Sequence, residues 1–221
     1  MSGDTLVLKE RLAEAARYVL LRRLAPAIRH NMAGSLQPIG MISAMLERQL
    51  QAAAPDFGKL GKNASDISEL SREAASVCMN MMTWLSPRER DLVPLNSGLT
   101  EALQLLATEL SFRGFTLVNE TTNVDTQVNR GTLRSLTMAS LIALTDATAG
   151  PARVVLSAQR LEGQTLLLIE LAATEGEMVP DSWQAYRRLG WDDVQALADA
   201  EGIALLHAEN RVELRFRAAD A

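Results

Sequence analysis

One histidine, His30, has surroundings that would let it do chemistry on another molecule. Apolar residues recur around it at helical spacing, namely Leu21, Ala25, Ile28, Met32, Ile39, Ile42, Leu46 and Leu50. This spacing predicts one long amphipathic helix. His30 is two residues from both Ile28 and Met32, so its side chain points about 200° around the helix from either of them, toward solvent. A solvent-facing imidazole can act as a nucleophile and carry a transferred group.

The residues one helical turn away from His30 are short. Ala33 and Gly34 follow it, and Pro26 and Ala27 precede it. Short neighbours leave the imidazole open to approach by another protein. The alternative is that His30 is an ordinary solvated surface residue with no chemical role.

The string from His30 to Ile39 resembles the H-box of bacterial sensor histidine kinases. That family pattern reads His-acidic-x-x-polar-Pro-Leu-x-x-Ile, on the first helix of a dimerising helical hairpin. Leu36 and Ile39 stand at the family's distances from His30. Three positions depart from the pattern: Asn31 replaces the acidic residue, Gly34 replaces Asn or Thr, and Ser35 replaces Pro.

Composition narrows the class of protein. The 221 residues are 48% apolar and only 4% aromatic, which favours helix-rich packing. The net charge of −5 gives no global field for nucleic acid or an anionic membrane. A lone cysteine, Cys78, allows no internal disulfide, and neither a signal peptide nor a run of about 18 apolar residues is present. We therefore expect a cytoplasmic protein without nucleic-acid or membrane partners.

Two long helices are expected in the first part of the chain. The first should run from Thr5 to Gln51, where Pro26 and Pro38 either divide it into segments or loosen it near His30. A second apolar stripe follows a turn and comprises Leu60, Ala64, Ile67, Leu70, Ala74 and Val77, with Cys78, Met79 and Met82 as packing residues. Because two helices cannot bury both of their faces alone, we expect a homodimeric four-helix bundle.

A charged linker that contains Pro87 separates two predicted domains. Residues 1–86 should form the helical hairpin, which serves dimerisation and phosphotransfer, and residues 91–221 an α/β sandwich. In the second domain, strands and helices alternate from Leu92 onward, and Asn96 or Ser97 is expected to cap the first helix. Such alternation predicts a sheet covered on one face by helices, so the fold class is α+β.

The order of elements in residues 91–221 resembles the catalytic ATP-binding domain of sensor kinases. The family's N-box reads Asn-Leu-x-x-Asn-Ala-x-Asp-Ala; this chain keeps Asp146 but has Ala139 and Ala143 in place of both asparagines. Residues 171–177 contain no aspartate to recognise adenine. The resemblance therefore implies a degenerate domain that binds no cofactor of its own. Asp146 is expected to be a surface or capping residue at a helix end.

A chain that carries a histidine on a helical hairpin but lacks the residues to phosphorylate it from ATP resembles the dimeric histidine phosphotransferases. The resemblance implies that His30 takes a phosphoryl group from one response-regulator receiver domain and passes it to another, with Mg²⁺ supplied by the receiver. A hybrid sensor kinase is a further expected partner. The residues expected to contact the partner are Arg23, Arg29, Ala33, Gly34 and Gln37.

Two alternatives remain open. The chain could be a non-catalytic dimeric scaffold, or pseudokinase, that binds a kinase or regulator and leaves His30 unmodified. It could also be a kinase with a remodelled nucleotide site.

Overall fold

The chain forms two compact units. A computed structural model describes residues 3–85, 91–176 and 187–217. One unit is Ala25–Arg88, here called the hairpin unit; the other combines Met1–Leu24 with Glu89–Ala221 and is called the α/β unit. The sequence placed all of residues 1–86 in the hairpin. The first 24 residues instead group with the α/β unit, because their apolar side chains are buried there.

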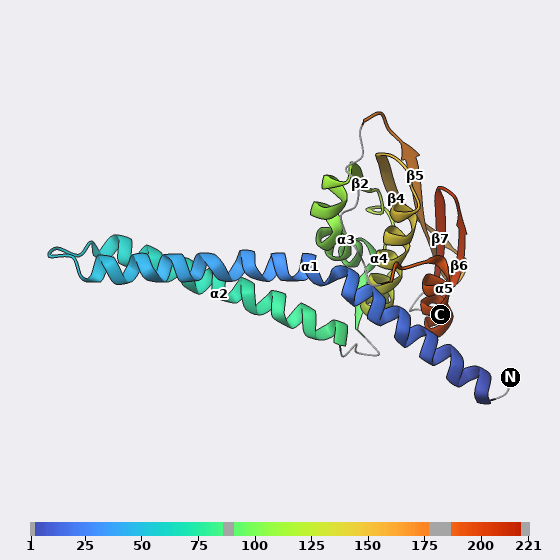
Figure 1. Ribbon diagram of the computed structural model, residues 1–221, viewed down its shortest axis with the longest axis horizontal. Coiled ribbons are helices and arrows are strands. Elements are labelled where there is room, and N and C mark those ends of the chain that lie inside the picture. Colours follow the sequence, from blue (N-terminus) through green and yellow to red (C-terminus); the bar gives the residue numbers. More distant parts are fainter. Residues whose placement is uncertain (1–2, 86–90, 177–186, 218–221) are drawn as a thin grey trace. The chain divides into compact units, whose positions relative to one another are not determined.

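Helix α1 (Gly3–Leu50) is a single helix of 48 residues that continues through Pro26 and Pro38. Its bounds agree with the predicted ones to within two residues, whereas the interpretation as separate segments is wrong. Each proline removes one backbone hydrogen bond, and the neighbouring turns maintain the helix. Helix α2 (Phe57–Leu85) returns antiparallel to the second part of α1 (Figure 1). Asn63 donates a hydrogen bond to Gln49 across the pair at 3.1 Å.

The hairpin unit buries few of its side chains within one chain. Among its described side chains, only Ser35, Leu60 and Ala74 are buried. Cys78, Met79 and Met82 are exposed in the single chain, so one chain by itself does not provide the packing expected of them. The physical reason is that a lone helical pair offers no second apolar layer to cover them.

The α/β unit is built on a five-stranded sheet with the order β2-β4-β5-β7-β6. Its strands are β2 (Phe115–Asn119), β4 (Ala152–Leu161), β5 (Gln164–Ala173), β6 (Ala204–Ala208) and β7 (Arg211–Arg217). The β2–β4 pair is parallel and the other pairs are antiparallel. A separate small ladder joins β1 (Leu92–Pro94) to β3 (Gln127–Asn129).

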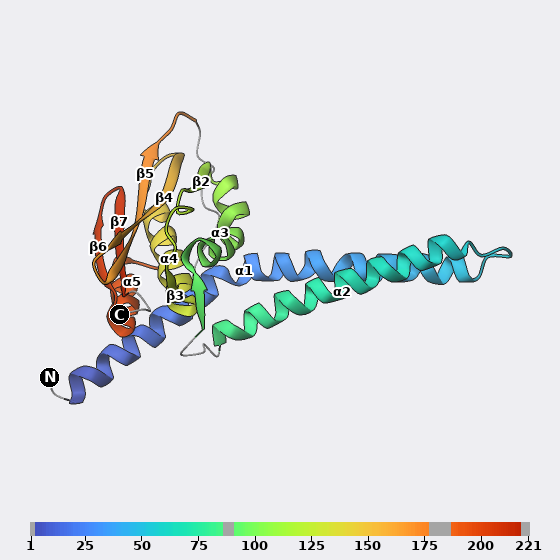
Figure 2. The same ribbon diagram turned by 180° about the vertical axis from the view of Figure 1, so that it is seen from behind.

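Besides the first part of α1, this unit contains the helices α3 (Leu95–Phe112), α4 (Arg130–Asp146) and α5 (Trp191–Glu201) (Figures 1 and 2). Buried and more exposed residues alternate along β5 and β7, so one face of the sheet is covered. Nearly every residue of α4 from Leu133 to Thr145 is buried, which makes α4 the centre of the core. The predicted fold class, a helical hairpin followed by an α/β sandwich, is confirmed.

Local signals explain where these helices begin and end. Asn129 caps α4 by accepting a hydrogen bond from the backbone N–H of Thr132 at 3.0 Å. Gly202 ends α5 with a φ of 65°, which a glycine adopts without strain. The predicted side-chain cap of α3 is wrong: the helix begins at Leu95, after Pro94, and no side chain caps it.

Candidate functional site

His30 lies in the hairpin unit with its side chain exposed. The apolar residues Ile28 and Met32 on either side of it are partly covered, as the helical spacing predicts. Ser35 is buried, and its hydroxyl donates to the carbonyl oxygen of Asn31 at 3.2 Å. Within the described parts of the chain, no hydrogen bond or ion pair joins His30 to another side chain. The imidazole is therefore available to an incoming group.

Small residues lie next to His30 on the surface of the helix. A Cβ atom added at Gly34 would meet no atom within 4 Å, so this position is open as well as small. Gln37 is exposed one turn further on, and Ala33 is partly exposed. Arg29 is exposed directly before the histidine and supplies a positive charge. These four predicted partner-binding residues therefore share the accessible surface of one helical stretch with His30.

Arg23 is not part of this accessible surface, which corrects the expectation that it attracts a partner. Its side chain is only 5% exposed and forms an ion pair with Glu109 of α3. A second carboxylate, Asp146 of α4, lies 3.8 Å from the same guanidinium nitrogen. Arg23 therefore belongs to the interior of the α/β unit.

Asp146 is likewise engaged, so the expectation of a surface or capping residue is wrong. Arg113 donates to its carboxylate at 2.7 Å and also to the carbonyl oxygen of Thr145 at 3.1 Å. The side chain of Asp146 is 13% exposed. Sequence reasoning missed this arrangement because Arg23, Glu109, Arg113 and Asp146 come from distant parts of the chain.

The α4 positions that match the N-box are covered. Ala139 is fully buried and Ala143 is 5% exposed, so both act as small packing residues. Neither side chain has an atom that could ligate a metal or bind a phosphate. Three residues on, the Asp146 carboxylate is neutralised by two guanidinium groups. The described part of this helix thus offers a nucleotide no accessible polar group at these three positions.

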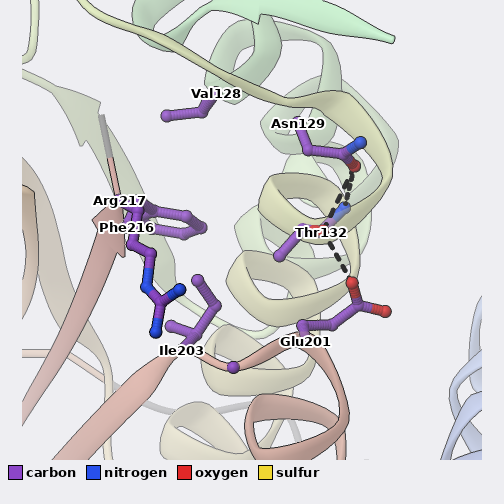
Figure 3. A pocket seen from close by; sticks show the side chains of 8 residues that line it. Val128, Asn129, Thr132, Glu201, Ile203, Phe216 and Arg217 are labelled. Atoms are coloured by element: carbon purple, nitrogen blue, oxygen red, sulfur yellow. Dashed lines mark hydrogen bonds between the residues drawn. The ribbon is translucent and has the colours of Figure 1, made fainter. Parts of the chain in front are cut away.

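A small pocket lies elsewhere in the α/β unit, at the beginning of α4 (Figure 3). Its volume is about 190 Å³, and its lining residues are Val128, Asn129, Thr132, Glu201, Gly202, Ile203, Phe216 and Arg217. Both oxygens of Glu201 are engaged, one by Thr132 at 2.8 Å and one by Arg17 at 2.7 Å. The carboxylate therefore serves mainly to tie α5 to its neighbours.

Two further possibilities are a chemical role for His207 and a metal site. His207 of β6 stacks on the ring of Trp191 at 4.2 Å between centroids, so it packs as a structural residue. Residues 3–85, 91–176 and 187–217 contain no group of three or more His, Cys, Asp or Glu side chains placed to hold a metal ion. Over the same residues, no helix has both the length and the apolar character needed to cross a membrane.

Comparisons with known proteins give low sequence identity. No protein-family model matches the chain, and no curated protein sequence does either. Among solved structures, the Acinetobacter baumannii histidine kinase AdeS is 13% identical, with 82% of this chain and 95% of that chain aligned at a TM-score of 0.46. A complex of the histidine kinase ThkA with the response regulator TrrA is 15% identical over 99% of this chain and 67% of that chain, at a TM-score of 0.42.

A further solved structure is described as a bacterial phosphotransferase. It is 12% identical and aligns over 90% of this chain and 95% of that chain, with a TM-score of 0.40. At these identities and TM-scores, the matches are likenesses of fold.

Proposed function

We propose that this chain is a histidine phosphotransferase of a bacterial phosphorelay. His30 takes a phosphoryl group from the aspartyl phosphate of one response-regulator receiver domain and passes it to the aspartate of a second receiver. The observation that carries the proposal is the exposed His30 beside the open Gly34 position, on a helix whose other face holds the apolar residues. A hybrid sensor kinase that bears a receiver domain would be an equally suitable donor.

The transfer needs few groups from this chain. An imidazole nitrogen of His30 attacks phosphorus, the bond from phosphorus to the aspartyl oxygen breaks, and the carboxylate leaves. The reverse sequence delivers the group to the next aspartate. Because an acyl phosphate is already reactive, positioning and charge stabilisation suffice. Asn31 fits this chemistry, since its amide cannot act as a general base toward His30.

The charge beside His30 suits an acidic partner. Receiver domains carry their phosphorylated aspartate in an acidic pocket that holds Mg²⁺, so this chain would need no metal or cofactor of its own. The exposed Arg29 would attract that pocket. The low surface at Ala33, Gly34 and Gln37 would let the pocket come close to the imidazole.

The α/β unit supports a role without ATP. Ala139 and Ala143 replace the asparagines that hold Mg²⁺ and phosphates in the resembled kinases, and both are buried. Asp146 is held by Arg113 and Arg23 rather than presented to a ligand. We propose that this unit is a degenerate nucleotide-binding domain that serves as a second docking surface.

The exposed apolar residues of the hairpin unit support a homodimer. Leu36 of α1 and Met79 and Met82 of α2 are all exposed in a single chain. Packing against a second hairpin would remove part of this area from water and form a four-helix bundle. The phosphotransferase would then carry two copies of His30.

A second candidate function is a non-catalytic dimeric scaffold. The departures from the H-box favour this function. At one of them Ser35 replaces the family's proline, and its side chain is buried and bonded to the carbonyl oxygen of Asn31. A scaffold would bind a receiver or kinase with the same surface and never be phosphorylated. The two candidates therefore differ in one measurable step.

Phosphotransfer to His30 tests the proposal. The purified protein is mixed with receiver domains that carry labelled aspartyl phosphate, alongside His30→Gln and, as a surface control, Arg48→Gln. We expect label on the parent and on Arg48→Gln and none on His30→Gln, with all three dimeric. Stoichiometric receiver binding without label on the parent would establish the scaffold instead.

A further inference from the structure

Residues 3–24 of α1 pack as an additional helix on the α/β unit. Five apolar residues on one face of this segment are buried: Ala13, Ala16, Val19, Leu20 and Leu24. Both views show this stretch running past α4 and α5 (Figures 1 and 2). Leu8 and Leu12, nearer the beginning of the segment, are exposed.

The apolar contacts of this segment do not define its axial position by themselves. The most deeply buried positions are 13, 16, 20 and 24, which recur every three to four residues. A slip of four residues would bring Leu12, Ala16 and Leu20 to the last three positions, and a slip in the other direction would bring Leu20, Leu24 and Ile28. Small or aliphatic side chains would thus reach these three positions in either register, whereas the position of Ala13 would receive Lys9 or Arg17.

Charged contacts distinguish these registers. Lys9 reaches Asp199 of α5 at 3.5 Å, and Arg17 reaches Glu201 at 2.7 Å. Both pairs are partly exposed, so each contributes little. Arg23 differs, because its guanidinium is almost entirely buried and contacts Glu109, with Asp146 3.8 Å away.

Arg23 completes a balanced cluster of four charges. Arg113 lies 2.7 Å from Asp146 and 3.7 Å from Glu109, so two guanidinium groups face two carboxylates. All four side chains are at most 15% exposed. A slip by one turn would withdraw Arg23 and leave one of the two nearly buried carboxylates without a counter-charge, which is costly at such a site.

We propose that Arg23 fixes residues 3–24 in a single register on the α/β unit, through the cluster of Arg23, Glu109, Arg113 and Asp146. The apolar face supplies the attachment of the helix, and the buried charges select one axial position. Apolar packing tolerates exchanges among aliphatic side chains of similar volume, whereas a buried charge without a counter-charge is costly. The two kinds of contact therefore have different roles. It is independent of whether His30 is phosphorylated.

Cysteine cross-linking with a short bismaleimide tests the register in the full-length chain. Cys78 is first replaced by Ser, and Glu201→Cys is combined either with Arg17→Cys, which reports the native register, or with Leu21→Cys, which reports a slip of one turn. Both reporter pairs remove the Arg17–Glu201 contact, so they compare equal backgrounds. Each is made with Arg23 retained and with Arg23→Met, which keeps the length and the apolar stem.

With Arg23 present we expect the 17–201 cross-link to form at least about tenfold faster than the 21–201 cross-link. With Arg23→Met the two rates should approach each other. Arg22→Met is the matched control, because Arg22 is exposed next to Arg23, and it should keep the native ratio. If Arg23→Met does not fold, Arg23→Gln, which removes the charge and keeps a hydrogen-bonding amide, replaces it. An unchanged native ratio in the folded Arg23 variant would overturn the proposal.

Discussion

The two units of this chain differ in how completely they bury their own apolar residues. All of the largest fully buried side chains belong to the α/β unit, among them Leu106, Leu141 and Leu144. The hairpin unit buries two apolar residues in its described part and leaves long side chains such as Met41 and Met79 in solvent. A sheet covered by helices closes a core by itself, whereas two helices do not. The difference indicates that the α/β unit is structurally complete and the hairpin unit is not.

The largest expected effect comes from a core residue of the α/β unit. Leu141→Ala removes a fully buried side chain from α4 and should lower the free energy of unfolding by about 3–5 kcal/mol. Met41→Ala, at a position that is 67% exposed in the hairpin unit, should change it by less than about 0.5 kcal/mol. Denaturant titration of both variants measures the contrast. Equal losses would mean that the hairpin is as well packed as the sandwich.

The next prediction concerns the apolar surface of the hairpin. Leu36 is exposed about 120° around α1 from His30, on the side of the predicted dimer contact. Leu36→Glu should weaken the homodimer at least roughly tenfold, because it places a charge in an apolar interface. Sedimentation velocity over a concentration series measures the dissociation constant.

Met41→Glu is the matched control for this prediction. Met41 is also exposed on α1, but it lies only about 20° around the helix from His30. The same change there should leave the dimer intact. A monomeric parent protein, or equal weakening by both variants, would contradict the assignment of the dimer face.

A smaller effect is expected at Gly34. Gly34→Ala adds a methyl group that meets no atom of the chain, so the hairpin should gain about 0.5–1 kcal/mol of stability from the better helix former. Phosphotransfer should become slower, because the methyl group stands one turn from His30 on the surface that the partner approaches. Thermal melts and transfer rates measured on the same preparation separate these two effects. Transfer at the parent rate would remove Gly34 from the contact surface.

Local patterns in the sequence were enough to predict most of the fold. The helical periodicity around His30 predicted α1 and the exposure of the imidazole. Arg23 and Asp146 were misassigned, because their environment is created by residues far away in the sequence. Arg113 is 33 positions from Asp146, and Glu109 is 86 positions from Arg23. Helical spacing carries no information about such contacts.

The exposure of Met79 shows a second limit of periodicity. An apolar stripe on α2 indicates that something must cover it, but does not say whether the cover comes from the same chain. In the α/β unit the cover is internal. In the hairpin unit the described side chains of the stripe such as Met79 and Met82 are exposed, so the same kind of pattern leads to opposite degrees of burial.

The source of the phosphoryl group tests the central claim most directly. The protein is incubated separately with labelled ATP and Mg²⁺ and with receiver domains that carry labelled aspartyl phosphate, and label on His30 is followed against His30→Gln. The account predicts label from a receiver, none from ATP, and none on the variant. Label on His30 from ATP would contradict it, because the α/β unit would then bind and use a nucleotide.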